Sequence, residues 1–318
     1  MSLGSNTLIR SKYGSCFLYE NNCDLTENLE KLFKNVPNLK HLKIDAFPDD
    51  EIVGNILVKT CKNLVGLSLE SNFTNCVDKE RLTDEGICDF IEDSNQKLQL
   101  LDLSKALSAN ISAKTIVNLS QLKCLTKLGL HSAQFDHFNL YFKSQEIHSV
   151  TQLSINCGFG REKFAHLLSN IDQLFVKLKS LTFQEIVYQS PKEYSDLKLT
   201  NLSENLEAFS IEESISIGDL VTIFPKIKEL SCMGCYNPPS VDSEVTYVGI
   251  TKFSLLRFNF DLEKLRNILK NMPNLEKFVL VSDTVGINDV KPNLPLNCDV
   301  EIVKENMNKV HKDSFMEF

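Results

Sequence analysis

The chain has 318 residues and a formal net charge of −8. An acidic chain repels phosphate backbones, so we expect no nucleic-acid partner. No stretch approaches the roughly 18 apolar residues needed to span a bilayer, and Met1 to Arg10 contain no apolar run of the kind found in secretory signals. We therefore expect no membrane partner and a location in the cytoplasm or the nucleus.

The ten cysteines are scattered without paired spacing, mostly beside leucines in apolar segments. This arrangement predicts reduced, buried thiols rather than a disulfide framework. The only C-x-x-C runs from Cys232 to Cys235, and neither a second pair nor suitably spaced histidines follow it to complete a zinc site. We interpret these two cysteines as buried residues of a repeat.

A six-residue phrase, Lys34-Asn35-Val36-Pro37-Asn38-Leu39, recurs almost unchanged at Lys270–Leu275, and apolar residues follow both copies at +3 and +5. Eight further segments share that spacing. The ten starts, separated by 21 to 34 residues, are Leu39, Leu64, Leu98, Leu125, Val150, Leu178, Leu206, Ile227, Ile250 and Leu275. Each start predicts a short buried strand, and ten in tandem indicate a repeat array.

Amphipathic helices are predicted between the strands, at Leu25–Val36, Ile52–Leu57 and Leu262–Met272. Pro37 and Pro273 would end two of them, and Thr83–Gly86 would begin another. Polar or turn-rich segments predict loops at Asn72–Arg81, Tyr188–Leu197 and Tyr236–Ser240. Near the ends, a capping strand is expected at Phe17–Tyr19 and a closing strand at Val300–Val303.

Each repeat is therefore a strand, a loop, a helix and a turn. One such unit cannot cover its own apolar face, so the units must stack into an α/β solenoid with parallel strands. We divide the chain into an N-terminal cap at residues 1–24, a solenoid of about ten repeats at 25–303 and a C-terminal tail at 304–318.

The apolar-x-x-apolar-x-apolar pattern resembles the leucine-rich repeat. The phrases Pro37–Ile44 and Cys61–Leu69 resemble the repeat half of F-box/leucine-rich-repeat proteins, within the ribonuclease-inhibitor-like superfamily. This resemblance implies a horseshoe with parallel concave strands and convex helices, and a role in capturing substrates for a cullin-type ubiquitin ligase. The chain departs from the pattern at the Asn/Cys ladder position, which only Asn72 and Cys235 fill. Only 24 residues precede the first repeat helix, so no F-box residue is assigned.

A second hypothesis is an inhibitor or regulator that clamps an enzyme or a small GTPase on its concave face. Ribonuclease inhibitors and Ran GTPase-activating proteins act in this way, with more regular repeats than those found here. In both hypotheses the partner is a protein that binds the concave face.

Strand side chains alternate, so residues between the strand leucines should line the concave face. Seven of the ten central positions are Ser, Thr or Gly. Crowding between inner strands explains small residues there, and so does a shallow polar floor for a partner. On this face apolar residues gather late in the chain, where they predict a contact site. The candidate binding residues are His131, Asn156, Gln184, Met233, Leu256, Val279 and Val281.

Catalytic patterns are weak throughout the sequence. Gly158-Phe-Gly160 lacks the third glycine of a dinucleotide loop, and the six histidines show no ligand spacing. The acid pairs Asp49-Asp50 and Glu212-Glu213 are interpreted as solvated charges. We therefore expect a protein that is not an enzyme and that uses no cofactor or metal.

Overall fold

The computed structural model describes residues 9–10, 30–45, 49–71, 82–93, 97–106, 112–135, 146–157, 164–184, 198–212, 216–233, 245–256, 262–282 and 285–304. The fold is α/β, with parallel strands and intervening helices. The chain forms two compact units, Met1–Asn156 and Cys157–Phe318. Among the helices in the described ranges, none is long and apolar enough to cross a membrane.

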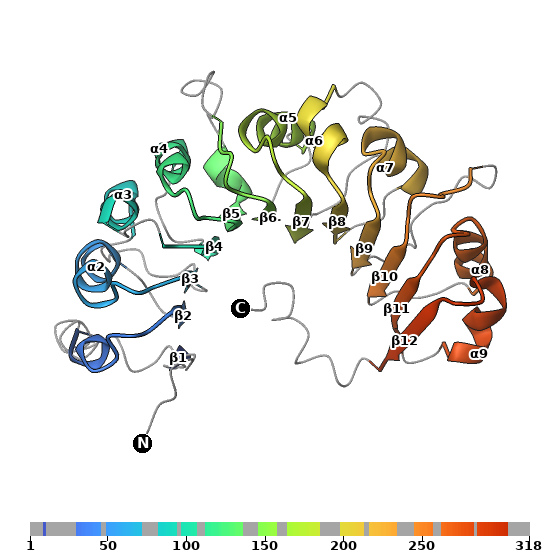
Figure 1. Cartoon of the computed structure of the whole chain (residues 1–318), viewed down its shortest axis with the longest axis horizontal. Coiled ribbons are helices and arrows are strands. Elements are labelled where there is room, and N and C mark those ends of the chain that lie inside the picture. Colours follow the sequence, from blue (N-terminus) through green and yellow to red (C-terminus); the bar gives the residue numbers. More distant parts are fainter. Residues whose placement is uncertain are drawn as a thin grey trace. The chain divides into compact units, whose positions relative to one another are not determined.

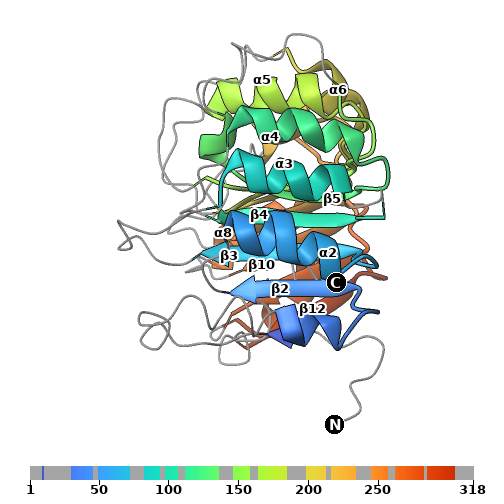
Figure 2. The same cartoon turned by 90° about the vertical axis from the view of Figure 1, so that its left-hand side faces the viewer.

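In the first unit, six strands pair in parallel and in sequence order. The strands are β1 (Ile9–Arg10), β2 (His41–Asp45), β3 (Gly66–Ser71), β4 (Leu100–Ala106), β5 (Lys127–His131) and β6 (Gln152–Asn156). The helices are η1 (Glu51–Leu57), α2 (Val58–Thr60), α3 (Asp84–Asp93), α4 (Ala113–Asn118), η2 (Leu119–Gln121) and η3 (Ser132–Phe135). Helices α2, α3 and α4 lie side by side on one face of the strands (Figures 1 and 2).

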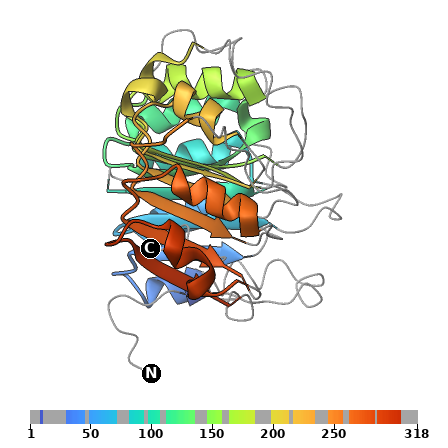
Figure 3. The ribbon, with the colours of Figure 1, turned by 90° about the vertical axis from the view of Figure 1, so that its right-hand side faces the viewer.

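The second unit repeats this arrangement (Figures 1 and 3). Its parallel strands are β7 (Ser180–Gln184), β8 (Ala208–Ile211), β9 (Glu229–Met233), β10 (Lys252–Leu256), β11 (Lys277–Val281) and β12 (Asp299–Val303). Its helices are α5 (Phe164–Leu174), α6 (Thr200–Asn205), α7 (Ile217–Ile223), α8 (Leu262–Lys270), α9 (Ile287–Val290) and η7 (Lys291–Asn293). In both units the opposite, helix-free side of the strands is called the open face below.

The predicted strand pattern is confirmed in every repeat. Each of the ten strands from β2 to β11 begins two residues after its predicted start. The +3 residues align across neighbouring strands, as Leu42, Leu67 and Leu101 do, and all the +3 and +5 side chains are at most 6% exposed. The repeat spacing therefore specifies the strand positions and most of the register, with one shift between Ser68 and Glu70 where β3 pairs with β4.

The helix predictions hold where the structure describes them. Residues 30–34 are helical, α3 begins at Asp84, and α8 ends at Lys270, before Pro273. The closing strand is confirmed as β12, and β1 is a strand that the sequence pattern did not predict. The capping strand at 17–19, the three predicted loops and the tail beyond Lys304 lie outside the described residues.

An asparagine just before the first apolar residue of a repeat fastens that repeat to the preceding one. The Nδ2 groups of Asn63, Asn205 and Asn274 donate hydrogen bonds at 3.2, 3.2 and 2.9 Å. Their acceptors are the carbonyls of Pro37, Val176 and Val248, each two residues before the first apolar residue of the previous repeat. These bonds satisfy turn carbonyls that the helices and strands leave unpaired.

Aspartates make a second set of links on the helix side. Asp50 accepts hydrogen bonds from the Thr83 backbone N–H and hydroxyl, both at 2.7 Å, just before α3. Asp84 accepts from the N–H of Ser112 at 2.9 Å, just before α4, and Asp172 accepts from the N–H of Leu202 at 2.7 Å, within α6. In each case a carboxylate of one repeat accepts a hydrogen bond from a backbone N–H at the start of the next helix, where N–H groups have no partner within the helix.

The interpretation of Asp49-Asp50 as solvated charges was wrong. The Asp49 carboxylate accepts a hydrogen bond from the Ile52 N–H at 2.8 Å and so caps its own helix, while Asp50 caps the next one. Both residues are half-buried. No sequence pattern indicated that Asp50 would accept hydrogen bonds from Thr83, because the two residues lie 33 positions apart.

Two glycines allow η1 and α3 to pack closely. A β-carbon on Gly54 would lie 3.1 Å from the Gly86 Cα, and one on Gly86 would lie 2.8 Å from the Asp50 Cα. Real β-carbons essentially never approach backbone atoms as closely as 2.8 Å. The stacking of these two repeats therefore requires glycine, which has no β-carbon, at position 86.

Replacing Gly86 with alanine should lower the free energy of unfolding by about 1–3 kcal/mol, because the methyl group overpacks against the Asp50 backbone. Urea unfolding followed by circular dichroism measures the change. Gly218→Ala is the matched control, since its β-carbon would meet Tyr247 Oη at an ordinary 3.5 Å. Equal stability of the two variants would contradict the close packing of η1 and α3.

Asp84 makes the stability of the first unit pH-dependent. Burial opposes ionisation, but hydrogen bonds from Ser112 and Thr115 outweigh it and hold the pKa of Asp84 below its ordinary value. The resulting stabilisation is complete above the unfolded pKa, about 3.9, and is lost as the pH falls through the folded value.

Replacing Asp84 with alanine should therefore lower stability by about 1 kcal/mol at pH 7. The gap between wild type and variant should narrow as the pH falls below about 4. Urea midpoints at pH 7 and pH 3 measure it, with the exposed neighbour Glu85→Ala as control. A gap that stays constant with pH would show that ionised Asp84 does not cap α4.

Candidate functional site

The open face of the second unit presents three rows of side chains that run across the strands. They alternate with core residues such as Phe253 and Leu255, so they point away from the helices. The row at the start of the strands is Ser180, Ala208, Glu229, Lys252, Lys277 and Asp299; the middle row is Thr182, Ser210, Ser231, Ser254, Val279 and Glu301. The row at the strand ends includes Met233, Leu256, Val281 and Val303.

Four charged side chains of this face form two ion pairs, and Asp299 at the start of β12 is exposed. Lys252 Nζ lies 2.5 Å from Glu229 Oε1, and Lys277 Nζ lies 3.3 Å from Glu301 Oε2. Just before β8, the Glu207 carboxylate forms ion pairs with Lys228 Nζ at 3.2 Å and Lys179 Nζ at 3.8 Å. The hydrogen bond and the charge of Lys228 hold the pKa of Glu207 below its usual value. These exposed pairs add little stability, but they leave the face locally close to neutral.

The row at the strand ends becomes apolar from β9 onward. Met233, Leu256 and Val281 are register neighbours, and Val303 continues the row on β12. Met233, Leu256 and Val303 are half-exposed, whereas Val281 is only 6% exposed. The available apolar contact surface is therefore centred on Met233 and Leu256.

The predicted binding residues divide between the two units. Met233, Leu256, Val279 and Val281 lie together on β9–β11, with Val279 half-exposed, and half-exposed Gln184 ends β7 of the same unit. His131 and Asn156 are register neighbours at the ends of β5 and β6 in the first unit. Asn156 is 2% exposed and Val281 is nearly as buried. Both therefore depart from the expectation of surface side chains, because neighbouring groups cover them.

The open face of the first unit is more polar. Asp102, at the centre of β4, is 8% exposed and accepts hydrogen bonds from the Ser104 hydroxyl at 2.6 Å and the Ser68 hydroxyl at 3.3 Å. At the start of β2, burial and then the charge of Lys40 lower the pKa of His41, which favours the neutral imidazole. The hydrogen bonds from Ser68 and Ser104 thus satisfy the buried Asp102 carboxylate within the first unit.

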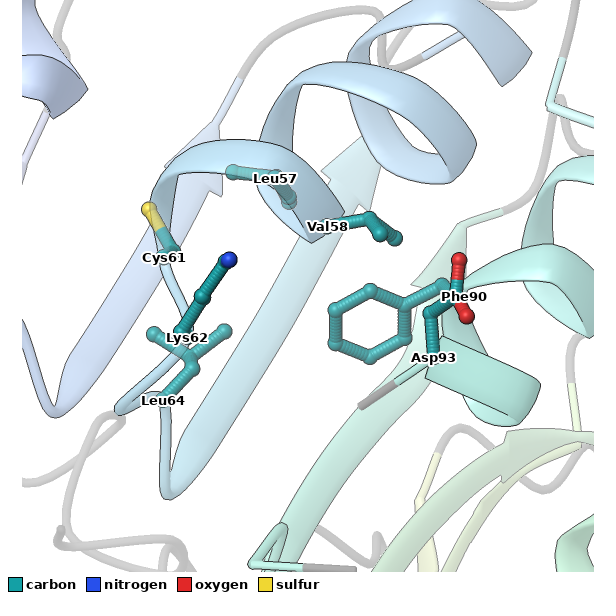
Figure 4. Close-up of a pocket in the computed structure, with 7 residues that line it drawn as sticks. All are labelled: Leu57, Val58, Cys61, Lys62, Leu64, Phe90 and Asp93. Carbon is teal, nitrogen blue, oxygen red and sulfur yellow. The ribbon is translucent and has the colours of Figure 1, made fainter. Parts of the chain in front are cut away.

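A pocket lies between two adjacent repeats on the helix side of the first unit (Figure 4). Phe90 projects from α3 toward α2, and the other lining residues are Leu57, Val58, Cys61, Lys62, Leu64 and Asp93. Its volume is about 270 Å³ when the solvent-open part is included. The space it encloses is only about 10 Å³, room for about one water molecule. Small-molecule sites commonly occupy roughly 300–1,000 Å³, so this depression is a gap between repeats.

The described cysteines and acidic residues offer little chemistry. Cys61, Cys88, Cys157 and Cys232 are buried thiols, whereas Cys124 is exposed, contrary to the expectation of buried thiols. Burial raises the pKa of the Cys61 thiol, which favours its unreactive protonated form. Within the described ranges, no group of three or more His, Cys, Asp or Glu residues is placed to hold a metal ion. Cys235, Gly158 and Gly160 lie outside them.

Sequence reasoning missed two features of the structure. The first is the pairing of charges on the open face of the second unit, which depends on which strands become neighbours. The second is the set of asparagine links between repeats, for which a signal existed: Asn38, Asn63, Asn205 and Asn274 all immediately precede a predicted start.

No family model and no curated protein sequence matches the chain. The geometry of the site itself therefore carries the functional argument.

The alkylation rates of two cysteines test whether Cys61 is buried and Cys124 is exposed. Cys124 should react with iodoacetamide at least about tenfold faster than Cys61 at pH 7.5, because the Cys61 thiol is buried and its pKa is raised. Peptide mass spectrometry after timed quenching measures both rates, and unfolding in urea should equalise them. Equal rates in the folded protein would place Cys61 at the surface.

Proposed function

We propose that this chain is a leucine-rich-repeat scaffold that binds a protein partner on the open face of its strands and catalyses no reaction. The observation that carries the proposal is the half-exposed pair Met233 and Leu256, adjacent on β9 and β10. Apolar side chains on an exposed face mark contact sites, and interfaces concentrate their energy in such anchors.

The proposed architecture is a horseshoe with concave strands and convex helices. Its support is the regular strand spacing, the parallel pairing in sequence order within each unit, and the helices that lie on one face of the strands in each unit (Figures 2 and 3). Solenoids of this kind use their strand face as an extended binding surface. A reducing location, cytoplasm or nucleus, fits the reduced cysteines of the described residues.

The resemblance to F-box/leucine-rich-repeat proteins gives the partner a specific role: it would be a substrate delivered to a cullin-type ubiquitin ligase. The competing role is that of an enzyme or small GTPase held in a regulatory clamp. These roles differ in whether ligase components accompany the partner, so the same capture experiment separates them.

Leu256→Asp should abolish capture of the partner, because it places an unpaired carboxylate in the apolar anchor of the interface. The matched control is Asn267→Asp, which adds the same charge to an exposed position on α8 in the same unit. Tagged wild type and both variants are used to capture proteins from cell lysate, the captured proteins are quantified by mass spectrometry, and circular dichroism verifies the fold.

A partner that is retained by wild type and Asn267→Asp and lost from folded Leu256→Asp supports the proposal. Co-recovery of the cullin adaptor favours substrate capture, and one stoichiometric partner without ligase components favours a clamp. Equal recovery on all three proteins would remove the strand face of β9 and β10 as the binding site.

A further inference from the structure

Hydroxyl side chains form a continuous line across four strands of the second unit. Thr182, Ser210, Ser231 and Ser254 occupy equivalent positions on β7, β8, β9 and β10. Each lies between two core residues of its strand, so its side chain points to the open face. We call these four residues the hydroxyl row. Crowding between strands explains their small size, but alanine or glycine would satisfy that requirement equally well.

Two members of the hydroxyl row lack the hydrogen bonds that buried hydroxyls normally make. Ser210 is only 6% exposed, and its Oγ has no hydrogen-bond partner. The Oγ of its register neighbour Ser231 is likewise buried and without a partner. An unpaired buried hydroxyl destabilises a fold. Two of them side by side on a potential binding face indicate groups whose partners arrive with a ligand.

Rotation about χ1 can bring these hydroxyls to a ligand. A serine side chain has three staggered positions on a strand, and neither hydroxyl would break a protein hydrogen bond by moving. A hydroxyl both donates and accepts, so the pair can satisfy the N–H and the C=O of one peptide group. The absence of bulk along the hydroxyl row allows a partner backbone to approach the strands.

The surroundings of the row select an uncharged ligand. At the strand starts, Glu229 is paired with Lys252, and Lys277 is paired with Glu301 of the middle row. Exposed Asp299 lies on β12, four strands from Ser210 on β8. At the strand ends lie half-exposed Met233 and Leu256. A charged ligand would have to displace an existing ion pair or contact apolar side chains, and both cost free energy.

We infer that the hydroxyl row and the adjoining Met233–Leu256 pair bind an uncharged, extended segment of the partner protein. Main-chain N–H and C=O groups of the segment hydrogen-bond to Ser210 and Ser231, and an aliphatic or aromatic side chain lies on Met233 and Leu256. This inference rests on the proposed function and adds to it the chemistry of the partner.

The inference predicts opposite effects of one change on stability and on binding. The double variant Ser210→Ala/Ser231→Ala removes two unsatisfied hydroxyls, so its Tm should rise by about 2–4 °C. Its affinity for the partner segment should fall about tenfold, since two hydrogen bonds to the segment are lost. Ser203→Ala is the matched control, because this α6 hydroxyl is already bonded to the Thr200 carbonyl at 3.0 Å and lies among the helices. It should leave binding unchanged.

The probe is a displayed library of random twelve-residue peptides, selected on the full chain. The expected winners carry one or two large apolar residues and no net charge, and their Kd changes less than about twofold between 50 and 500 mM NaCl. Binding should be lost with Leu256→Asp and weakened in the double serine variant. Winners of consistent charge, or no winners, would overturn the inference, as would unchanged binding by the double serine variant.

The two proposals fail in distinguishable ways. If lysate capture depends on Leu256 while the library selects charged peptides or none, the scaffold function stands and the uncharged segment is rejected. If neither capture nor selection depends on Leu256, both are rejected. A double serine variant that gains stability and keeps its full affinity assigns the hydroxyl row to packing alone.

Discussion

Each repeat can bury its apolar residues only against its neighbours, and this constraint shapes the whole structure. A strand of five residues places two side chains, such as Phe278 and Leu280, on the core side. Those side chains become inaccessible only because the strands on either side carry equivalent residues in register. Burial therefore increases with each added repeat, and the sheet extends in sequence order within each unit. The hydrophobic effect supplies the driving force, and the repeat spacing supplies the register.

Polar links at the joints make that stacking specific. The asparagine amides at residues 63, 205 and 274 bind turn carbonyls of the preceding repeat, and the carboxylates of Asp50, Asp84 and Asp172 bind N–H groups at the start of the next helix. These are groups that a single repeat would leave unsatisfied. Apolar contacts alone tolerate sliding between repeats, whereas these directional bonds fix one arrangement.

The open face of the second unit combines features that rarely serve stability. Its ion pairs are exposed and weakly stabilising, two of its buried hydroxyls have no partner, and Met233 and Leu256 remain half-exposed. Proteins that bind other molecules commonly retain locally unfavourable groups where the ligand will satisfy them. On the helix side, Asp84 and Thr115 of the first unit satisfy one another, whereas the buried side-chain amide of Asn170 on α5 of the second unit has no hydrogen-bond partner.

The sequence by itself determined the strands, their register and the identity of the core, because the apolar spacing within a repeat directly encodes which side chains face inward. It also indicated several helix limits, through residues such as Pro273 and Thr83, and it located the apolar end of the open face. Only the tertiary structure decided that Val281 and Asn156 are buried, that Asp50 caps the next helix, and that Lys252 faces Glu229. These properties arise from contacts between residues about 20 to 35 positions apart. Such contacts depend on how adjacent repeats are stacked, which a local sequence pattern does not show.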